Sequence, residues 1–308
     1  MTARAQARVR FKDFKGIVRK GSLDPFWISN IFWRPFSVYV SWPLAALRVP
    51  ANAITAVSCV FAVIGSLVVL YPSTAAYVAS VVFMQVFFFL DHVDGEVSRF
   101  ERVRTGERAY VDRSGGYFDR LVHYFQGPSF FFCLGAGLGI ADANPLWAIL
   151  GVVGGIGSSG FPRFTASYEL LTLLIDRSDD QAREFAGRYG GYYTIYWTPS
   201  DAVRPFFIIP RNFRELVVAA KQYIWFPGHM FVYAGAVVLM AVHGAGILWI
   251  KLYLAVYSAI LGVNTIFATV SYLKILSAVP SAGGARTHGV APGGDGRVAM
   301  VGSEAREG

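Results

Sequence analysis

Six stretches of about 20 mostly apolar residues constrain this chain more than any other feature, because each is long enough to cross a bilayer as a helix. Soluble domains carry about 25% charged residues. This chain has 16% charged and 54% hydrophobic residues. We therefore expect an all-α membrane protein with six transmembrane helices, at residues 53–71, 75–93, 115–139, 145–162, 225–243 and 247–273.

Most of the 28 Lys and Arg residues fall on one side of this topology. Nine lie in 1–48, five in 99–113 and eight in 163–221, and the connections at 72–74, 140–144 and 244–246 have none. Loops rich in Lys and Arg stay in the cytoplasm. We therefore expect a multi-pass protein of the bacterial plasma (inner) membrane, with both termini and the active site cytoplasmic. The net charge of +8 then reflects topology and contact with anionic membrane lipids, not nucleic acid.

The chain outside the apolar stretches divides into three further parts. Residues 25–48 combine many aromatic residues with few charges, which predicts an interfacial amphipathic segment with Trp27, Trp33 and Trp42 at headgroup level. The predicted organisation is an N-terminal segment 1–48, a membrane domain 49–276 with a cytoplasmic insertion 164–222, and a tail 277–308. The tail is rich in Gly, Ala and Ser, so we expect it to be disordered.

Two acids, Asp91 and Asp94, close the second apolar stretch. At positions i and i+3 they share one face of a helix. Each ionisable group at membrane depth costs roughly 2.5 to 3.5 kcal/mol, and a bound divalent cation would offset that cost. If the helix ends here, its negative C-terminal dipole adds to the attraction for a cation.

A second polar cluster, Gly115, Asp119 and His123, opens the third apolar stretch. Its spacing of four predicts a single helical stripe, and a helix N-terminus there would favour phosphate. Each residue alone has a simpler explanation: Asp94 as an interface anchor, His123 as a hydrogen-bonded core residue, and Gly115 as a packing site. Together they favour a site in which cation and phosphate bind side by side.

The spacing of both clusters resembles the signature of the CDP-alcohol phosphatidyltransferase family, D-x-x-D-G-x-x-A-R followed by G-x-x-x-D-x-x-x-D. The matching residues here are Asp91-x-x-Asp94-Gly95-x-x-Ser98-Arg99 and Gly115-x-x-x-Asp119-x-x-x-His123. Asn52 and Thr55 also resemble the family's P-N-x-x-T entry to the first span, with Ala51 inserted after Pro50.

This chain departs from the family pattern at three points. Ser98 replaces alanine, and His123 stands where the last aspartate is expected. The gap from Arg99 to Gly115 holds fifteen residues where the family has about eight, a difference close to two helical turns. Asp112 therefore stays open as an alternative third metal ligand to Asp119.

The resemblance implies a homodimeric enzyme that uses Mg²⁺ or Mn²⁺, with two divalent ions in the site. It would move a phosphatidyl or related phosphoalcohol group from a CDP-alcohol, such as CDP-diacylglycerol, to the hydroxyl of an alcohol or phosphorylated alcohol, releasing CMP in phospholipid biosynthesis. Asp91, Asp94 and Asp119 would hold metal, and His123 would be the general base or a further ligand. The nucleotide pocket would be lined by Asn52, Thr55, Gly95, Ser98, Arg99 and Gly115.

Other functions are compatible with parts of this pattern. A membrane prenyltransferase also binds diphosphate through Asp-held magnesium, but it carries two separated Asp motifs, and this chain has one cluster. A transporter would place an ion site near the midplane with paired broken helices. A non-catalytic scaffold would retain the fold without turnover, as the His123 and gap departures allow.

Overall fold

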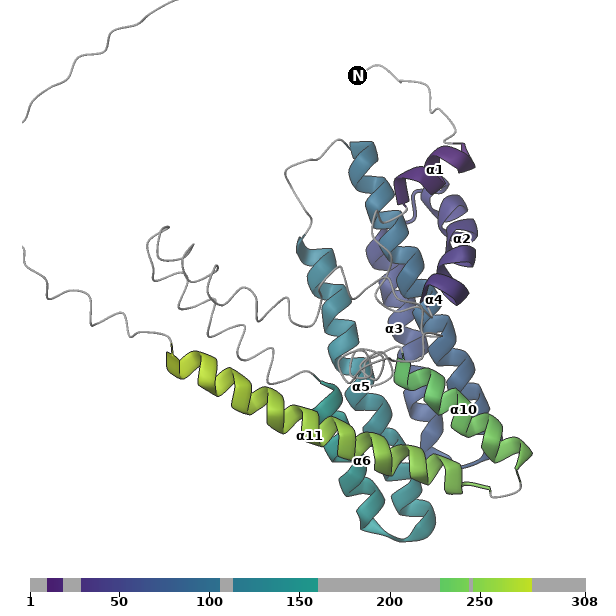
Figure 1. The fold of residues 1–308 in the computed structure, drawn as a ribbon. Helices are drawn as coiled ribbons and strands as arrows, with labels where there is room; N and C mark the ends of the chain where they lie inside the picture. The colour runs from purple at the N-terminus through teal and green to yellow at the C-terminus, as the bar shows by residue number, and fades with distance from the viewer. Residues whose placement is uncertain (1–9, 19–28, 106–112, 160–227, 244–245, 279–308) are drawn as a thin grey trace, which may run out of the picture.

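The computed structural model describes residues 10–18, 29–105, 113–159, 228–243 and 246–278, and all regular elements in these ranges are helices (Figure 1). The expected all-α class is therefore confirmed for the described residues. The insertion 164–222 and residues 279–308 lie outside them. The helices are α1 (Phe11–Val18), η1 (Ser29–Trp33), α2 (Arg34–Ala46), α3 (Ala51–Leu67), η2 (Val68–Leu70), α4 (Thr74–Thr105), α5 (Arg113–Asp142), α6 (Pro145–Ser158), α10 (Gly228–Val242) and α11 (Leu248–Ala278).

Three of the described helical segments are long and apolar enough to cross a membrane: Ala51–Leu70, Thr74–Arg104 and Leu248–Lys274. They are compatible with a membrane protein, but the expected number of six spans is wrong by this criterion. Helices α6 and α10 have 14 and 15 residues. At 1.5 Å per residue they reach about 21 to 23 Å, short of a hydrocarbon core of about 30 Å. Helix α5 is long, but its first half carries Asp119, His123 and Gln126.

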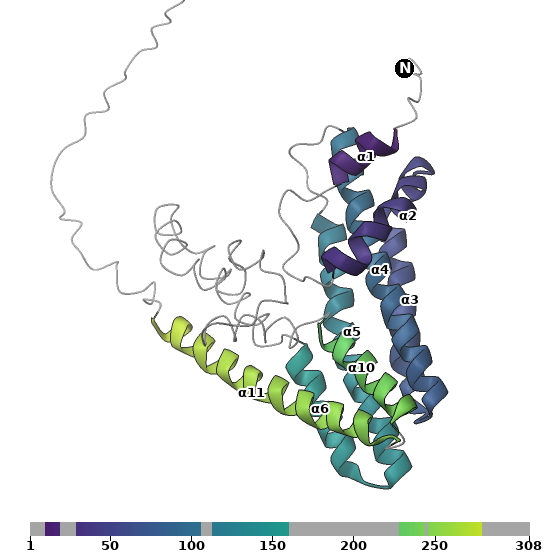
Figure 2. The ribbon, with the colours of Figure 1, turned by 45° about the vertical axis from the view of Figure 1, so that its right-hand side comes forward.

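Helix α4 is the central rod of the described structure (Figures 1 and 2). It packs against α3 along its length, against α2 and α1 near its C-terminal half, and against α10. Helix α3 also contacts α5, so α3, α4 and α5 meet as a group. This group brings the two polar clusters of the sequence together.

The sequence suggested that the two polar clusters lie at facing helix ends, but in the structure they do not. Helix α4 continues to Thr105, so Asp91 and Asp94 lie well inside it. Helix α5 begins at Arg113, so His123 lies between two and three turns inside it. Dipole effects act within the first and last turn. The expected help from helix dipoles therefore does not apply at Asp91, Asp94 or His123.

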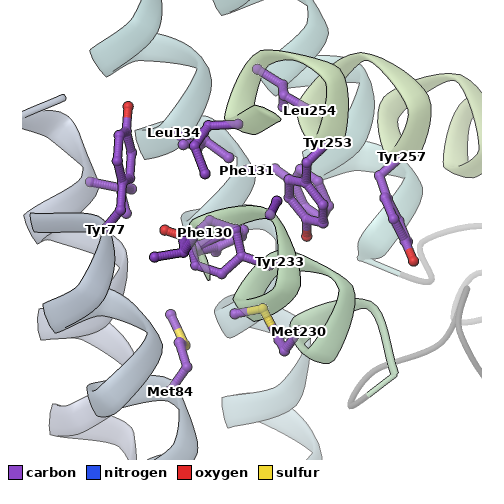
Figure 3. Close-up of a cluster of buried hydrophobic side chains, with 14 of the residues drawn as sticks. Tyr77, Met84, Phe130, Phe131, Leu134, Met230, Tyr233, Tyr253, Leu254 and Tyr257 are labelled. Atoms are coloured by element: carbon purple, nitrogen blue, oxygen red, sulfur yellow. The ribbon is translucent and has the colours of Figure 1, made fainter. Parts of the chain in front are cut away.

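An aromatic core fills the space between α4, α5, α10 and α11 (Figure 3). The Phe130 ring meets Tyr233 edge-on at a centroid distance of 4.9 Å, and the Phe131 ring stacks on Tyr253 at 6.2 Å. All four side chains are buried. This core fixes α5 against α10 and α11 and so holds the helix that carries Asp119 and His123.

Helices α5 and α6 approach each other closely at two glycines. A Cβ at Gly151 would lie 2.7 Å from the carbonyl oxygen of Phe131, and one at Gly135 would overlap the carbonyl oxygen of Trp147 at 2.5 Å. Helix α6 starts at a cap in which the Asn144 side chain accepts a hydrogen bond from the Leu146 amide at 3.0 Å. Only glycine, which has no Cβ atom, fits at these two positions of the contact between α5 and α6.

The far end of α5 is tied to α11 by an ion pair. The Lys251 ammonium lies 2.5 Å from the Asp142 carboxylate, which also accepts a hydrogen bond from the Trp147 indole at 2.8 Å. The hydrogen bond from Lys251 holds the pKa of the Asp142 carboxyl below its usual range, with the Trp147 bond acting in the same direction. This contact lies at the opposite end of α5 from His123.

Candidate metal centre

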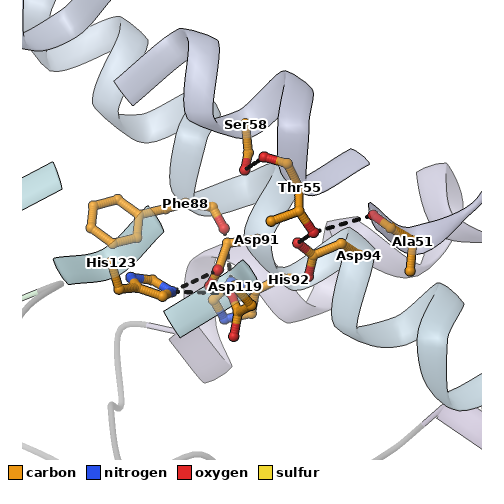
Figure 4. A network of polar contacts seen from close by, with 9 residues as sticks. All are labelled: Ala51, Thr55, Ser58, Phe88, Asp91, His92, Asp94, Asp119 and His123. Atoms are coloured by element: carbon orange, nitrogen blue, oxygen red, sulfur yellow. Dashed lines mark hydrogen bonds and ion pairs between the residues drawn. The ribbon is translucent and has the colours of Figure 1, made fainter. Parts of the chain in front are cut away.

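Asp91 on α4 and two residues of α5, Asp119 and His123, converge on one point (Figure 4). The His123 Nε2 atom lies 2.8 Å from Asp91 Oδ1 and 3.5 Å from Asp119 Oδ1. Asp119 and His123 are four residues apart, so one turn of α5 presents both toward α4. The structure therefore brings together three of the residues that the sequence marked as metal ligands.

The three side chains are partly open to their surroundings. The exposed fractions are 22% for Asp91, 42% for Asp119 and 35% for His123. Structural ion pairs deep in a helical bundle are closed to ligands, whereas these side chains can be reached. The openness favours a binding role over a purely structural one.

The donor set of this cluster fits a divalent cation. One ligand atom from each of Asp91, Asp119 and His123 lies within 4.8 Å of the other two. Two carboxylates suit Mg²⁺ or Mn²⁺, and an imidazole among them tilts the preference toward Mn²⁺. Metal ligation by His123 through Nε2 would require the loss of its contact to Asp91, because an imidazole ligand must be unprotonated at the binding atom.

Asp94 faces a different helix from Asp91. It is buried, with 6% of its surface exposed, and its Oδ2 accepts a hydrogen bond of 2.6 Å from the Thr55 hydroxyl on α3 (Figure 4). The sequence pattern predicted Asp94 and Thr55 as part of the site, and this hydrogen bond joins the two residues directly. Asp94 is not part of the three-residue cluster: its hydrogen bond goes to α3, whereas Asp91 contacts α5.

The other residues of the sequence pattern lie around this centre with different roles. Gly95 and Ser98 are half-buried on α4, and a Cβ at Gly95 would lie 3.3 Å from an Arg99 guanidinium nitrogen. Arg99 donates from Nε to the Val18 carbonyl oxygen on α1 at 2.9 Å. That contact directs part of its guanidinium to the N-terminal helix.

Two predicted residues lie at helix starts. Asn52 is exposed in the first turn of α3, and Gly115 is in the first turn of α5. The alternative ligand Asp112 is outside the described residues.

Trp33, one of the three tryptophans expected at the membrane interface, packs beside the Asp91–Asp94 motif. Trp33 is 6% exposed and stacks on the His92 ring at 5.9 Å, so its side chain packs inside the protein. Trp42 is exposed, and Trp27 lies outside the described residues. Burial against Phe88 and Phe231 explains the difference, since aromatic partners from α4 and α10 cover the Trp33 ring.

Sequence reasoning missed three polar residues next to the motif. Glu96 on α4 is buried, and its two carboxylate oxygens accept hydrogen bonds from Ser37 and Ser41 on α2. A possible signal was the pair of serines four residues apart inside an otherwise aromatic segment. Such a pair forms a hydroxyl stripe on a helix.

Comparison of the chain with models of known protein families and with curated protein sequences finds no match.

Proposed function

We propose that this protein is a membrane-embedded, metal-dependent CDP-alcohol phosphotransferase. The observation that carries the proposal is the convergence of Asp91 on α4 with Asp119 and His123 on α5. The resemblance predicts that these positions share one centre, although the gap between the two halves of the pattern is longer than in the family. The 2.8 Å contact between residues 32 positions apart supports this alignment.

The geometry also supports Asp119 as the third acidic ligand. Asp119 and His123 sit one turn apart and face Asp91 together. The seven extra residues before Gly115 then act as a longer connection between α4 and α5 and do not change the spacing within α5. Asp91, Asp119 and Asp94 are the residues that would hold the divalent ions.

The proposed reaction is a single displacement at phosphorus. The acceptor hydroxyl oxygen forms a bond to the β-phosphorus of the CDP-alcohol, the bond from that phosphorus to the oxygen of CMP breaks, and the hydroxyl proton passes to a base. Bound divalent ions would neutralise the pyrophosphate charge. The residues of the chain orient the ligands and accept the proton.

His123 is the proposed general base. With Asp91 accepting from the Nε2–H group, a neutral imidazole carries its lone pair on Nδ1, and this atom would take the proton. Asp91 then keeps the ring in one tautomer and orientation. A neutral base adds no negative charge beside a substrate that already carries a pyrophosphate.

The membrane setting supports a lipid substrate. We propose a bacterial inner-membrane enzyme with its site on the cytoplasmic side. The sequence pattern places the basic segments 1–48, 99–113 and 163–221 on the same side of the membrane as the motif, and basic segments of this kind stay in the cytoplasm. The donor is a CDP-linked lipid such as CDP-diacylglycerol, and the acceptor is an alcohol or a phosphorylated alcohol. A homodimer is proposed on the resemblance alone.

The experiment that tests the function is reversal of the reaction in purified protein. Protein in lipid nanodiscs is given CMP, Mg²⁺ or Mn²⁺ and bacterial phospholipids, and CDP-linked lipid is measured by mass spectrometry. The proposal expects product with wild type and none with Asp91→Asn or Asp119→Asn. Asp13→Asn, an exposed acid on α1, serves as the matched control.

The competing functions give different results in the same preparation. No product under any nucleotide condition overturns the proposal. Release of diphosphate from a prenyl diphosphate would identify the prenyltransferase alternative. Metal binding without any turnover would identify a non-catalytic protein.

A further inference from the structure

The carboxylate of Glu96 joins the motif helix α4 to the N-terminal helix α2. Its Oε1 accepts a hydrogen bond of 2.7 Å from Ser37, and its Oε2 accepts one of 2.6 Å from Ser41. Glu96 is 6% exposed, and both serines have no exposed surface. We refer to these three residues as the Glu96 contact.

The two serines do not need Glu96 to satisfy their hydroxyls. Ser41 Oγ also lies 2.9 Å from the Ser37 carbonyl oxygen, and Ser37 Oγ lies 3.5 Å from the Arg34 carbonyl oxygen. Serines in helices often bond to their own backbone in this way. Each hydroxyl has one proton, which it can give to either acceptor. When that proton goes to Glu96, the bond ties two helices together and satisfies a buried carboxylate that would otherwise be costly.

Helix α2 buries Ser37 and Ser41 beside Val38 and Ala45, while Phe36 and Tyr39 are 60% or more exposed. Hydrophobic burial alone does not account for two serines on the buried face. The inward serines are thus explained by the carboxylate that they contact.

Three acids of α4 contact three different neighbouring helices. Asp91 contacts α5, Asp94 contacts α3, and Glu96 contacts α2. Because they lie within two turns of one rigid helix, any rotation of α4 about its axis would disturb all three contacts. Glu96 is tied to two hydroxyl donors on its neighbour, Ser37 and Ser41.

We propose that Glu96 is a positioning residue. Its contact with Ser37 and Ser41 fixes the rotation of α4 so that Asp91 meets Asp119 and His123 while Asp94 meets Thr55. The inference rests on the proposed function insofar as this cluster is the metal centre. It assigns to the N-terminal helix α2 a role in the geometry of that centre.

The test measures Mn²⁺ binding by electron paramagnetic resonance in the full-length protein, independently of turnover. Glu96→Ala and the double variant Ser37→Ala/Ser41→Ala are expected to weaken Mn²⁺ binding roughly 3- to 10-fold. This loss is smaller than the 10- to 100-fold typical of residues that hydrogen-bond directly to a metal-ligating side chain. Glu96→Gln is expected to stay within about twofold of wild type, because its amide can accept from one serine and donate to the other.

Ser80→Ala is the matched control. Ser80 is also fully buried, lies on α4 and donates to another helix, through the Gly65 carbonyl oxygen at 2.7 Å. This variant is expected to lower the melting temperature while leaving Mn²⁺ binding unchanged. If Glu96→Ala does not fold, the Ser37→Ala/Ser41→Ala and Glu96→Gln variants still decide the question.

Two outcomes overturn the proposal. One is unchanged Mn²⁺ binding in the double serine variant, whatever its melting temperature, and the other is a Glu96→Gln variant as weak as Glu96→Ala. Failure of the proposed function is separate, since wild type would then bind Mn²⁺ but form no CDP-linked lipid. In that case weaker Mn²⁺ binding in the double serine variant still supports the positioning role.

Discussion

His123 and Asp91 are in direct contact, with Nε2 and Oδ1 separated by 2.8 Å, although they are 32 positions apart in the chain. This contact joins α5 to α4 at the point where both polar clusters of the sequence meet. The imidazole and the carboxylate are each partly exposed. Both side chains therefore keep part of their surface available to a ligand.

Removal of one acid from the cluster is expected to weaken metal binding. Asp119→Asn keeps the size of the side chain but removes a charged oxygen donor, so Mn²⁺ affinity should fall at least about tenfold. Titration of Mn²⁺ by electron paramagnetic resonance measures the change. Asp13→Asn should bind like wild type, and an unchanged affinity in Asp119→Asn would exclude Asp119 as a ligand.

Replacement of His123 separates the base from the ligand. For a general base, His123→Ala should lower turnover roughly 10²- to 10⁴-fold while CMP and Mn²⁺ still bind. Turnover is followed by CDP-lipid formation and binding by calorimetry. If Mn²⁺ binding disappears together with activity, ligation is the main role of His123.

The Thr55 hydroxyl is expected to stabilise the buried Asp94 carboxylate. Thr55→Val keeps the shape but removes the donor of the 2.6 Å bond, so the unfolding free energy should fall by about 1–3 kcal/mol. Thr55→Ser should restore most of the loss. Thermal unfolding in detergent compares the three proteins, and equal melting temperatures would show that Asp94 finds another donor.

Addition of a methyl group between α5 and α6 should destabilise the protein. In Gly151→Ala the new Cβ would meet the Phe131 carbonyl oxygen at 2.7 Å, and overpacking of this kind costs about 1–3 kcal/mol. Gly235→Ala is the control, because a Cβ there meets nothing within 4 Å. The melting temperatures of the two variants are compared, and equal values would show that the helices can separate without cost.

The Asp142 and Lys251 pair should give the protein a specific sensitivity to acid. The pKa of the Asp142 carboxyl is lowered from 3.8 by its hydrogen bond from Lys251. Its stabilising contribution is therefore present above the unfolded pKa and is lost as the pH falls through the lower folded value. The melting temperature of wild type should exceed that of Asp142→Asn at pH 6, and the difference should shrink below pH 4. A difference that is constant with pH would contradict this assignment.

The sequence was a good guide to the helices and to contacts within one helix. The Asp119 and His123 stripe follows directly from a spacing of four residues. The end of α4 was not predictable in the same way, because the polar run after Asp94 contains Glu101, Arg102 and Arg104, which favour a helix as much as a loop.

Contacts between helices depend on packing that spacing does not reveal. Glu96 is 55 positions from Ser41 and 59 positions from Ser37, and the sequence of α4 does not indicate which residues of α2 it contacts. The burial of Trp33 likewise depends on Phe231 of α10. Apolar composition alone predicted too many spans, because α6 and α10 are only 14 and 15 residues long.

The uninterrupted course of α4 has a consequence for ligand binding. Its 32 residues form a rod of about 48 Å, and Asp91, Asp94 and Glu96 occupy fixed positions on it. Binding at the proposed centre would therefore leave the backbone spacing of these acids unchanged. Any tightening of the centre must come from α5, which would carry Asp119 and His123 toward a prearranged half-site.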